Sequence, residues 1–119
     1  MQSTSFRRRS AALLFAALLA ASIPAGAASP AAAPAEATIE IKTFMFNPAM
    51  LTVVAGTTVR WTNLDAEPHT VASVGGAFRS GALDEGESFA FTFAKPGSYR
   101  YVCSIHPQMV GTILVKAAP

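Results

Sequence analysis

The chain lacks an apolar run long enough to cross a bilayer. Its longest such run, Ala11–Ala21, has about eleven residues, whereas a membrane-spanning helix needs about twenty. Three arginines precede this run (Arg7–Arg9), Pro24 interrupts it, and the small residues Ala25–Ala27 follow. This order predicts a secretory signal peptide over residues 1–27, and hence a periplasmic protein; an uncleaved anchor or an amphipathic helix is the alternative.

An excess of positive charge is also missing once that segment is removed. Nine Lys and Arg stand against seven Asp and Glu, but three of the nine are Arg7–Arg9, which leaves six against seven and a net charge of −1. No basic patch with interleaved aromatic residues follows residue 27. We therefore expect no nucleic-acid partner and no stable insertion of the mature domain into a membrane.

Cysteine is the scarcest residue with chemical consequences, because Cys103 is the only one. No disulfide can form within the chain, although small exported domains commonly depend on disulfides. An unpaired thiol in an oxidising compartment is a liability unless deep burial, another chain or a metal occupies it. Cys103 is therefore the first candidate for a functional residue.

The mature chain shows no convincing 3.6-residue hydrophobic period either. Residues 28–37 are rich in Ala and Pro, which predicts a flexible or extended lead-in. From Thr38 onward, apolar and polar residues alternate with period two in short segments separated by turn residues such as Lys95–Ser98. About seven or eight strands of this kind predict an all-β domain over residues 38–119, an antiparallel β-sandwich.

The same alternation predicts which residues form the core. Three phenylalanines share one face of a strand, and two tyrosines share a face of the next strand with the cysteine. These residues are Phe89, Phe91, Phe93, Tyr99, Tyr101 and Cys103. Trp61 is expected in the core as well, whereas Val74–Leu83 has little pattern and is expected to be a loop or an irregular strand.

A cluster of metal-binding side chains lies near the end of the chain. Cys103, His106 and Met109 follow one another at intervals of three residues. Thiolate, imidazole and thioether are soft or borderline donors that suit copper, and a short loop can turn all three toward one point. The only other histidine is His69, so the sequence predicts a copper site with His69, Cys103 and His106 in a plane and Met109 as a distant axial ligand.

These residues stand in a pattern that resembles the cupredoxin family of type 1 blue-copper proteins. The matching segments are Trp61–Asn63, Pro68–His69, Pro96–Tyr99 and the loop from Cys103 to Met109. The stretch between His106 and Met109 is short. In its length the loop resembles that of amicyanin more than that of plastocyanin or pseudoazurin. The resemblance implies a Greek-key β-sandwich with one copper ion, a carrier of single electrons rather than an enzyme.

The resemblance also implies a surface for redox partners. It places the ring edge of His106 at the surface beside Pro107, with Pro68, Met45 and Phe46 as further candidates to line an apolar patch. Similarity to amicyanin implies an amine-oxidising dehydrogenase as electron donor, a c-type cytochrome as acceptor and a monomeric carrier.

Three further residues are expected next to the ligands. The resemblance implies that the Asn63 side chain hydrogen-bonds near Ser104 and so ties the two ligand segments together. Family members commonly have proline where this chain has Ile105, which keeps its N–H. Our hypothesis is that the Ile105 amide donates to the Cys103 sulfur and raises the reduction potential of the site.

Other classes of protein fit parts of this sequence. A copper-trafficking or storage protein of the same fold would use the same ligands with faster exchange. An enzyme with a Cys103–His106 nucleophile pair lacks an apparent third, orienting group. A metal-free adhesion sandwich leaves the unpaired cysteine and the ligand spacing unexplained.

Overall fold

The computed structural model describes residues 12–14, 16–23, 26 and 35–119. The predicted signal peptide over residues 1–27 and most of the lead-in over residues 28–37 lie outside these residues and stay predictions. Across the described ranges, no helix is long and apolar enough to span a membrane.

Eight strands and no helix make up the regular structure of residues 35–119. The strands are β1 (Glu36–Lys42), β2 (Met45–Asn47), β3 (Met50–Val54), β4 (Thr57–Asn63), β5 (Ala72–Ser73), β6 (Ser88–Phe93), β7 (Gly97–Val102) and β8 (Val110–Lys116). The prediction of an all-β domain with seven to eight short strands is confirmed. The first strand begins at Glu36, two residues before the expected start of the domain.

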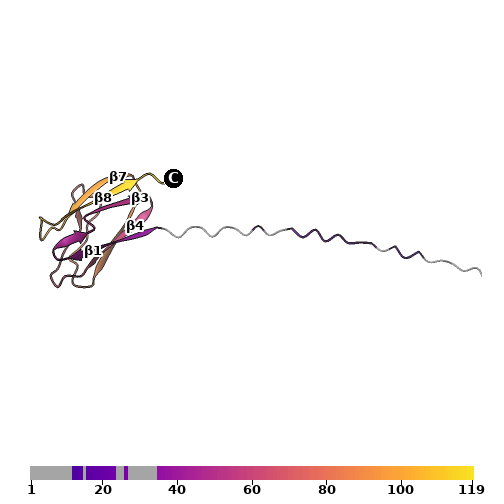
Figure 1. Ribbon diagram of the computed structural model, residues 1–119, viewed down its shortest axis with the longest axis horizontal. Helices are drawn as coiled ribbons and strands as arrows, with labels where there is room; N and C mark the ends of the chain where they lie inside the picture. The colour runs from indigo at the N-terminus through magenta and orange to yellow at the C-terminus, as the bar shows by residue number, and fades with distance from the viewer. Residues whose placement is uncertain (1–11, 15, 24–25, 27–34) are drawn as a thin grey trace, which may run out of the picture. The chain divides into compact units, whose positions relative to one another are not determined.

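The strands form two four-stranded sheets that pack face to face. One sheet has the order β2-β1-β4-β6 and the other the order β3-β8-β7-β5; Figure 1 shows β3, β8 and β7 in one layer and β1 and β4 in the other. The expectation of wholly antiparallel sheets is corrected, because β1 pairs parallel with β4 and β3 pairs parallel with β8. The chain crosses from one sheet to the other between β2 and β3 and returns for β4, so β4 arrives beside β1 in the same direction.

The alternation of side chains along the strands separates a buried face from a solvent-exposed face. In β4 the side chains of Thr57, Val59, Trp61 and Asn63 are buried, while Arg60 between them is exposed. Trp61 is fully buried, as expected, and its ring contacts those of Phe78, Phe89, Phe93 and Tyr101. Burial of such aromatic side chains is the main source of stability in a domain of this size.

The expected core residues are found on the expected faces, with one addition. Phe93, Tyr101 and Cys103 are buried, and Phe89, Phe91 and Tyr99 pack against the core while partly exposed. The addition is Phe78, which is only 4% exposed although it lies in the weakly patterned segment. That segment is a loop with isolated bridges from His69 to Leu83 and from Ala72 to Arg79, as its lack of period predicted.

Candidate metal centre

The hairpin between β7 and β8 brings three of the predicted ligands together. Cys103 follows the last residue of β7 and Met109 precedes the first residue of β8. The Cys103 N–H donates to the Met109 carbonyl over 3.1 Å, and the Met109 N–H donates to the His106 carbonyl over 2.9 Å. These two bonds close the loop, so its side chains converge instead of alternating between faces as they would in a strand.

The fourth predicted ligand, His69, arrives from a distant part of the chain. It follows β4 and exchanges two backbone hydrogen bonds with Leu83, of 3.1 and 2.7 Å. Its side chain is fully buried, whereas that of His106 is half-buried. The sandwich thus holds the inner imidazole rigidly beside the β7–β8 loop.

The donor atoms of these residues are spaced as a metal plane requires. The Cys103 Sγ atom lies 3.9 Å from His69 Nδ1 and 3.8 Å from His106 Nδ1, and the three donor atoms all lie within 4.8 Å of one another. With metal–sulfur and metal–nitrogen bonds of about 2.3 and 2.0–2.1 Å, as for zinc, trigonal geometry places sulfur and nitrogen about 3.7–3.8 Å apart. Both imidazoles therefore present Nδ1 at a distance that fits a metal ion between them and the sulfur.

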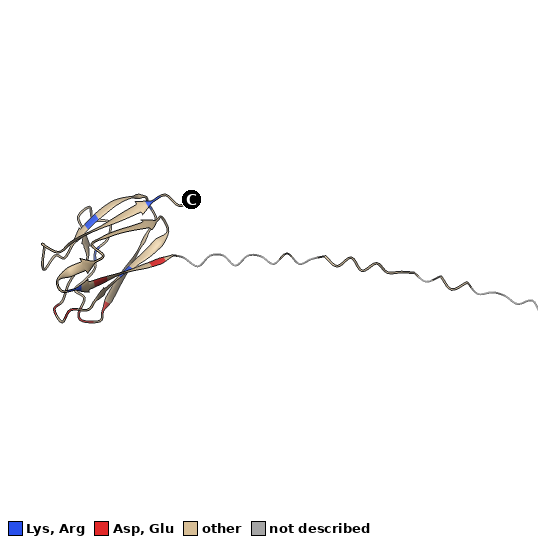
Figure 2. Ribbon diagram, in the orientation of Figure 1, with Lys and Arg blue, Asp and Glu red and all other residues tan. Residues whose placement is uncertain are grey.

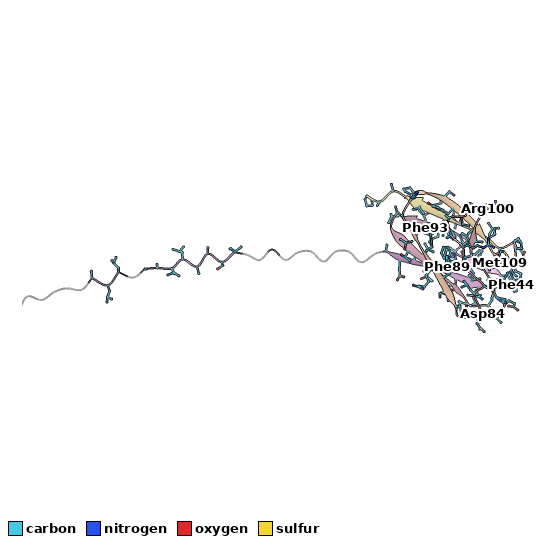
Figure 3. All side chains as sticks on the ribbon, turned by 180° about the vertical axis from the view of Figure 1, so that it is seen from behind. Phe44, Asp84, Phe89, Phe93, Arg100 and Met109 are labelled. Atoms are coloured by element: carbon cyan, nitrogen blue, oxygen red, sulfur yellow. The ribbon has the colours of Figure 1, made fainter. Side chains whose placement is uncertain are left out.

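Met109 completes the set at the edge of the site. It is 2% exposed and lines a small cavity with Phe44, Met45 and Val110; Figure 3 shows it at the same end of the domain as Phe44. Two imidazoles, a thiolate and a thioether form the donor set of a type 1 copper site. His69, Cys103, His106 and Met109 are positioned as such a site.

The surroundings of Cys103 favour its ionised form. Burial opposes a charged sulfur, but the Thr70 amide, the His69 ring and both the amide and the ring of His106 outweigh burial and lower the pKa of Cys103 to about 6. A metal ligand must be the thiolate. At neutral pH most of the sulfur is therefore already in the form that binds a metal.

Thr70, and not Asn63, ties the two ligand segments together. The Thr70 N–H lies 3.4 Å from the Cys103 sulfur, and the Thr70 hydroxyl accepts from the Ser104 N–H and contacts the Ser104 hydroxyl, both at 2.7 Å. The expectation that the Asn63 side chain hydrogen-bonds near Ser104 was wrong. The Asn63 amide donates instead to the carbonyls of Glu67 and Leu83, because it is buried under the turn that leads to His69.

The hypothesis about Ile105 is not supported either. The backbone amides that lower the pKa of Cys103 belong to Thr70 and His106. Ile105 lies in the loop with 46% of its surface exposed, on the solvent side of the site. A proline at this position would therefore remove no donor to the sulfur that the structure describes.

We expect Thr70→Val to destabilise the domain by about 1–2 kcal/mol, because it leaves the Ser104 N–H without its acceptor. Chemical denaturation of the metal-free protein measures this loss. Thr70→Ser keeps the hydroxyl and is expected to cost less. The matched control is Thr62→Val, which removes an exposed bond to Ser88 and is expected to change stability by under about 0.5 kcal/mol. Equal stability of the valine and serine variants at position 70 would contradict the role of the hydroxyl.

A carboxylate that the sequence analysis did not single out contacts the inner imidazole. Asp65 Oδ2 lies 2.8 Å from His69 Nε2, and the carboxylate also accepts the N–H groups of Thr43 and Phe44 over 2.7 and 2.9 Å. Burial would favour the neutral acid, but these amides and His69 prevail and lower the pKa of Asp65. With Nε2–H directed at the carboxylate, the Nδ1 lone pair of His69 is left for a metal.

The turn held by this carboxylate has an unusual backbone. Thr43 and Phe44 link β1 to β2 and have φ angles of 57° and 56°. A two-residue hairpin turn with two positive φ angles normally uses Asn-Gly, since each side chain with a Cβ in this region costs about 1–2 kcal/mol. Alternation alone could not reveal this turn, because neither residue is a typical turn former.

The residues predicted to form a partner surface differ in exposure, and the surface itself stays a prediction. Pro107, Pro68 and Met45 are exposed, and His106 is half-buried. Phe46 is 2% exposed and belongs to the core, so its assignment to the surface was wrong. The aromatic residue at the surface is Phe44, two positions earlier and 40% exposed. Its ring meets the rings of His69 and His106 edge-on, with centroids 5.1 and 5.0 Å apart.

Comparison with known families agrees with this geometry. The family described as the cupredoxin-like domain matches residues 10–115. The chain belongs to the cupredoxin family, whose members bind copper, and the resemblance stated from the sequence is confirmed.

Individual relatives are similar over the folded domain. Amicyanin from Paracoccus versutus is 39% identical over 71 residues, which cover 56% of this chain and 54% of the relative. Plastocyanin from Scenedesmus fuscus is 34% identical over 85 residues, which cover 60% of this chain and 87% of the relative. A solved purple cupredoxin from Nitrosopumilus maritimus superposes with a TM-score of 0.63 at 36% identity and covers 67% of this chain and 99% of that one. The chain thus spans about half the length of the first of these relatives.

Proposed function

We propose that this protein is a periplasmic electron carrier that binds one copper ion through His69, Cys103, His106 and Met109. The observation that carries the proposal is the convergence of the Cys103 sulfur and two Nδ1 atoms at 3.9 and 3.8 Å. Bound copper supplies a one-electron Cu(II)/Cu(I) couple. The similarity to amicyanin and plastocyanin supports the same assignment.

The closed site favours a carrier over an enzyme. Four protein side chains would hold the copper ion, which would leave no position open for a substrate, unlike a catalytic metal site. The sulfur of Cys103 belongs to a fully buried side chain. A nucleophile paired with His106 would have to reach a substrate, which this burial prevents.

The two imidazoles differ: His69 is held in one position, and His106 is accessible from the surface. His69 is fixed by two backbone bonds to Leu83 and by its bond to Asp65, so its donor atom keeps one position. Only His106 reaches the surface, where Pro107 and Ile105 are exposed beside it. Because electron transfer weakens with distance, we assign entry and exit of the electron to the ring of His106.

The partner is a redox protein that docks on the surface formed by His106, Pro107 and Ile105. Lys and Arg are scattered over the described domain and form no basic stripe, as Figure 2 shows, which favours a protein partner over nucleic acid. The resemblance to amicyanin implies an amine-oxidising dehydrogenase as donor and a c-type cytochrome as acceptor. A small apolar contact suits rapid docking and release by a monomeric carrier.

Copper loading of the purified mature domain tests the proposal. We expect one Cu(II) per chain, an intense blue absorption band, a type 1 EPR spectrum and reversible one-electron voltammetry. A purple band would instead match the colour of the Nitrosopumilus maritimus relative and would contradict the blue assignment. A pale protein that releases copper readily to a chelator would favour the trafficking or storage alternative.

A further inference from the structure

One carboxylate connects the interior of the site with the surface of the protein. Asp65 is 12% exposed at its side chain and lies four residues before His69. Its Oδ1 atom accepts from the Thr43 N–H, and its Oδ2 atom accepts from the Phe44 N–H and faces His69 Nε2. Two contacts from the distant β1–β2 turn and one from the nearby His69 thus meet on a single side chain.

The contact with the turn determines where Phe44 lies. Both residues of the turn have positive φ angles, so the turn has little intrinsic tendency to form. Acceptance of both turn amides by one carboxylate compensates for this, and it also fixes the direction of the Phe44 side chain. The ring then lies edge-on to both imidazoles, at 5.1 Å from His69 and 5.0 Å from His106.

The contact with His69 distinguishes the two imidazoles. His69 has a carboxylate on the nitrogen that faces away from the sulfur. In the described part of the chain, the His106 ring hydrogen-bonds only with Cys103. A negative charge on the far nitrogen makes an imidazole a stronger donor and favours the more highly charged metal ion.

We propose that Asp65 is a positioning residue that lowers the reduction potential through His69 and holds the Phe44 ring over both imidazoles. The proposal rests on the proposed function, since it assigns to Asp65 the tuning of the same copper site. It makes one side chain responsible for two properties, the electronic environment of the inner ligand and the aromatic cover of the docking surface.

Asp65→Asn tests the proposal, because the amide keeps the size of the side chain but has one acceptor oxygen instead of two. We expect Cu(II) affinity to fall by about 10–100-fold, with Cu(I) affinity changed less. A tenfold loss selective for Cu(II) appears as a rise of about 59 mV in midpoint potential. The matched control is Asp84→Asn, which removes a carboxylate that is exposed and is expected to leave the potential unchanged.

A second substitution separates the two contacts. Thr43→Gly in the Asp65→Asn background relieves the turn, since glycine adopts positive φ without penalty. Asp65→Asn is expected to lower the thermal stability of the domain because it weakens the contact with the turn. We expect Thr43→Gly to recover much of this loss and none of the shift in potential. Recovery of both would mean that the potential moved only because the turn collapsed, and this would overturn the role of the carboxylate at His69.

A readout without copper distinguishes a failure of this proposal from a failure of the proposed function. Nitrogen NMR of the metal-free protein is expected to show His69 protonated at Nε2 in the wild type and in Asp84→Asn, and a mixture of tautomers in Asp65→Asn. The ring resonances of Phe44 should shift in Asp65→Asn alone. An unchanged His69 tautomer together with an unchanged potential would refute the proposal, even if the wild-type protein is blue.

Discussion

Replacing Cys103 with serine is expected to abolish the intense visible absorption of the copper-loaded protein. The sulfur lies 3.9 and 3.8 Å from the two Nδ1 atoms, and only a thiolate supplies the soft, charged donor of a type 1 site. A serine hydroxyl stays protonated at neutral pH and holds Cu(I) poorly. We expect the reversible one-electron wave to disappear with the band, as absorption spectroscopy and voltammetry of the same sample would show.

The metal-free protein provides the control for this substitution. The pKa of Cys103 is lowered in the folded state from 9.0 to about 6, so the thiolate stabilises the fold above pH 9, and this stabilisation is lost as the pH falls from 9 to 6. The wild type should therefore gain stability over Cys103→Ser between pH 6 and 9, by at most about 1.4 kcal/mol per pH unit. Denaturation midpoints measured across this range check the gain. Parallel pH profiles of the two proteins would show that the sulfur is not ionised as described.

The strands and the ligand loop were predictable because their signals are local. Alternation of side chains identifies the buried face of β4 from Val59 and Trp61, and the spacing of Cys103, His106 and Met109 is visible within seven residues. The parallel pairing of β1 with β4 was missed because alternation shows which face is buried and not which strand lies alongside.

The residues that surround the ligands were less predictable, since their contacts join distant segments. Asp65 bonds to Thr43 across 22 positions, and Thr70 bonds to Ser104 across 34. Phe44 was passed over in favour of Phe46 because the two-residue turn between β1 and β2 has no glycine or asparagine to indicate it. Without the turn, the side of the sheet on which each phenylalanine lies could not be assigned.

Gly111→Ala is expected to be the most destabilising of the single-methyl additions to this chain. Gly111 is the cross-strand partner of Tyr101, and an added Cβ would overlap with the Cζ and hydroxyl atoms of that ring. The Tyr101 ring is fully buried and packs against Phe46 and Trp61, at centroid distances of 4.7 and 5.4 Å, so it cannot move aside. We expect a loss of about 3 kcal/mol, which corresponds to a fall of roughly 12–24 °C in Tm for a domain of this size.

Two comparisons make this expectation specific to the clash. Gly81→Ala places its Cβ in open space and is expected to change Tm by only a few degrees, since alanine there reduces the entropy of the unfolded chain. In a Tyr101→Leu background the obstructing ring is gone, so Gly111→Ala should cost much less than it does in the wild type, and the two substitutions should be strongly non-additive. Additive losses in calorimetry would place the cost of Gly111→Ala in the backbone of β8. Non-additive losses would establish that Gly111 is required because the buried Tyr101 ring occupies the space that a side chain would need. This position lies in β8, the strand that follows Met109.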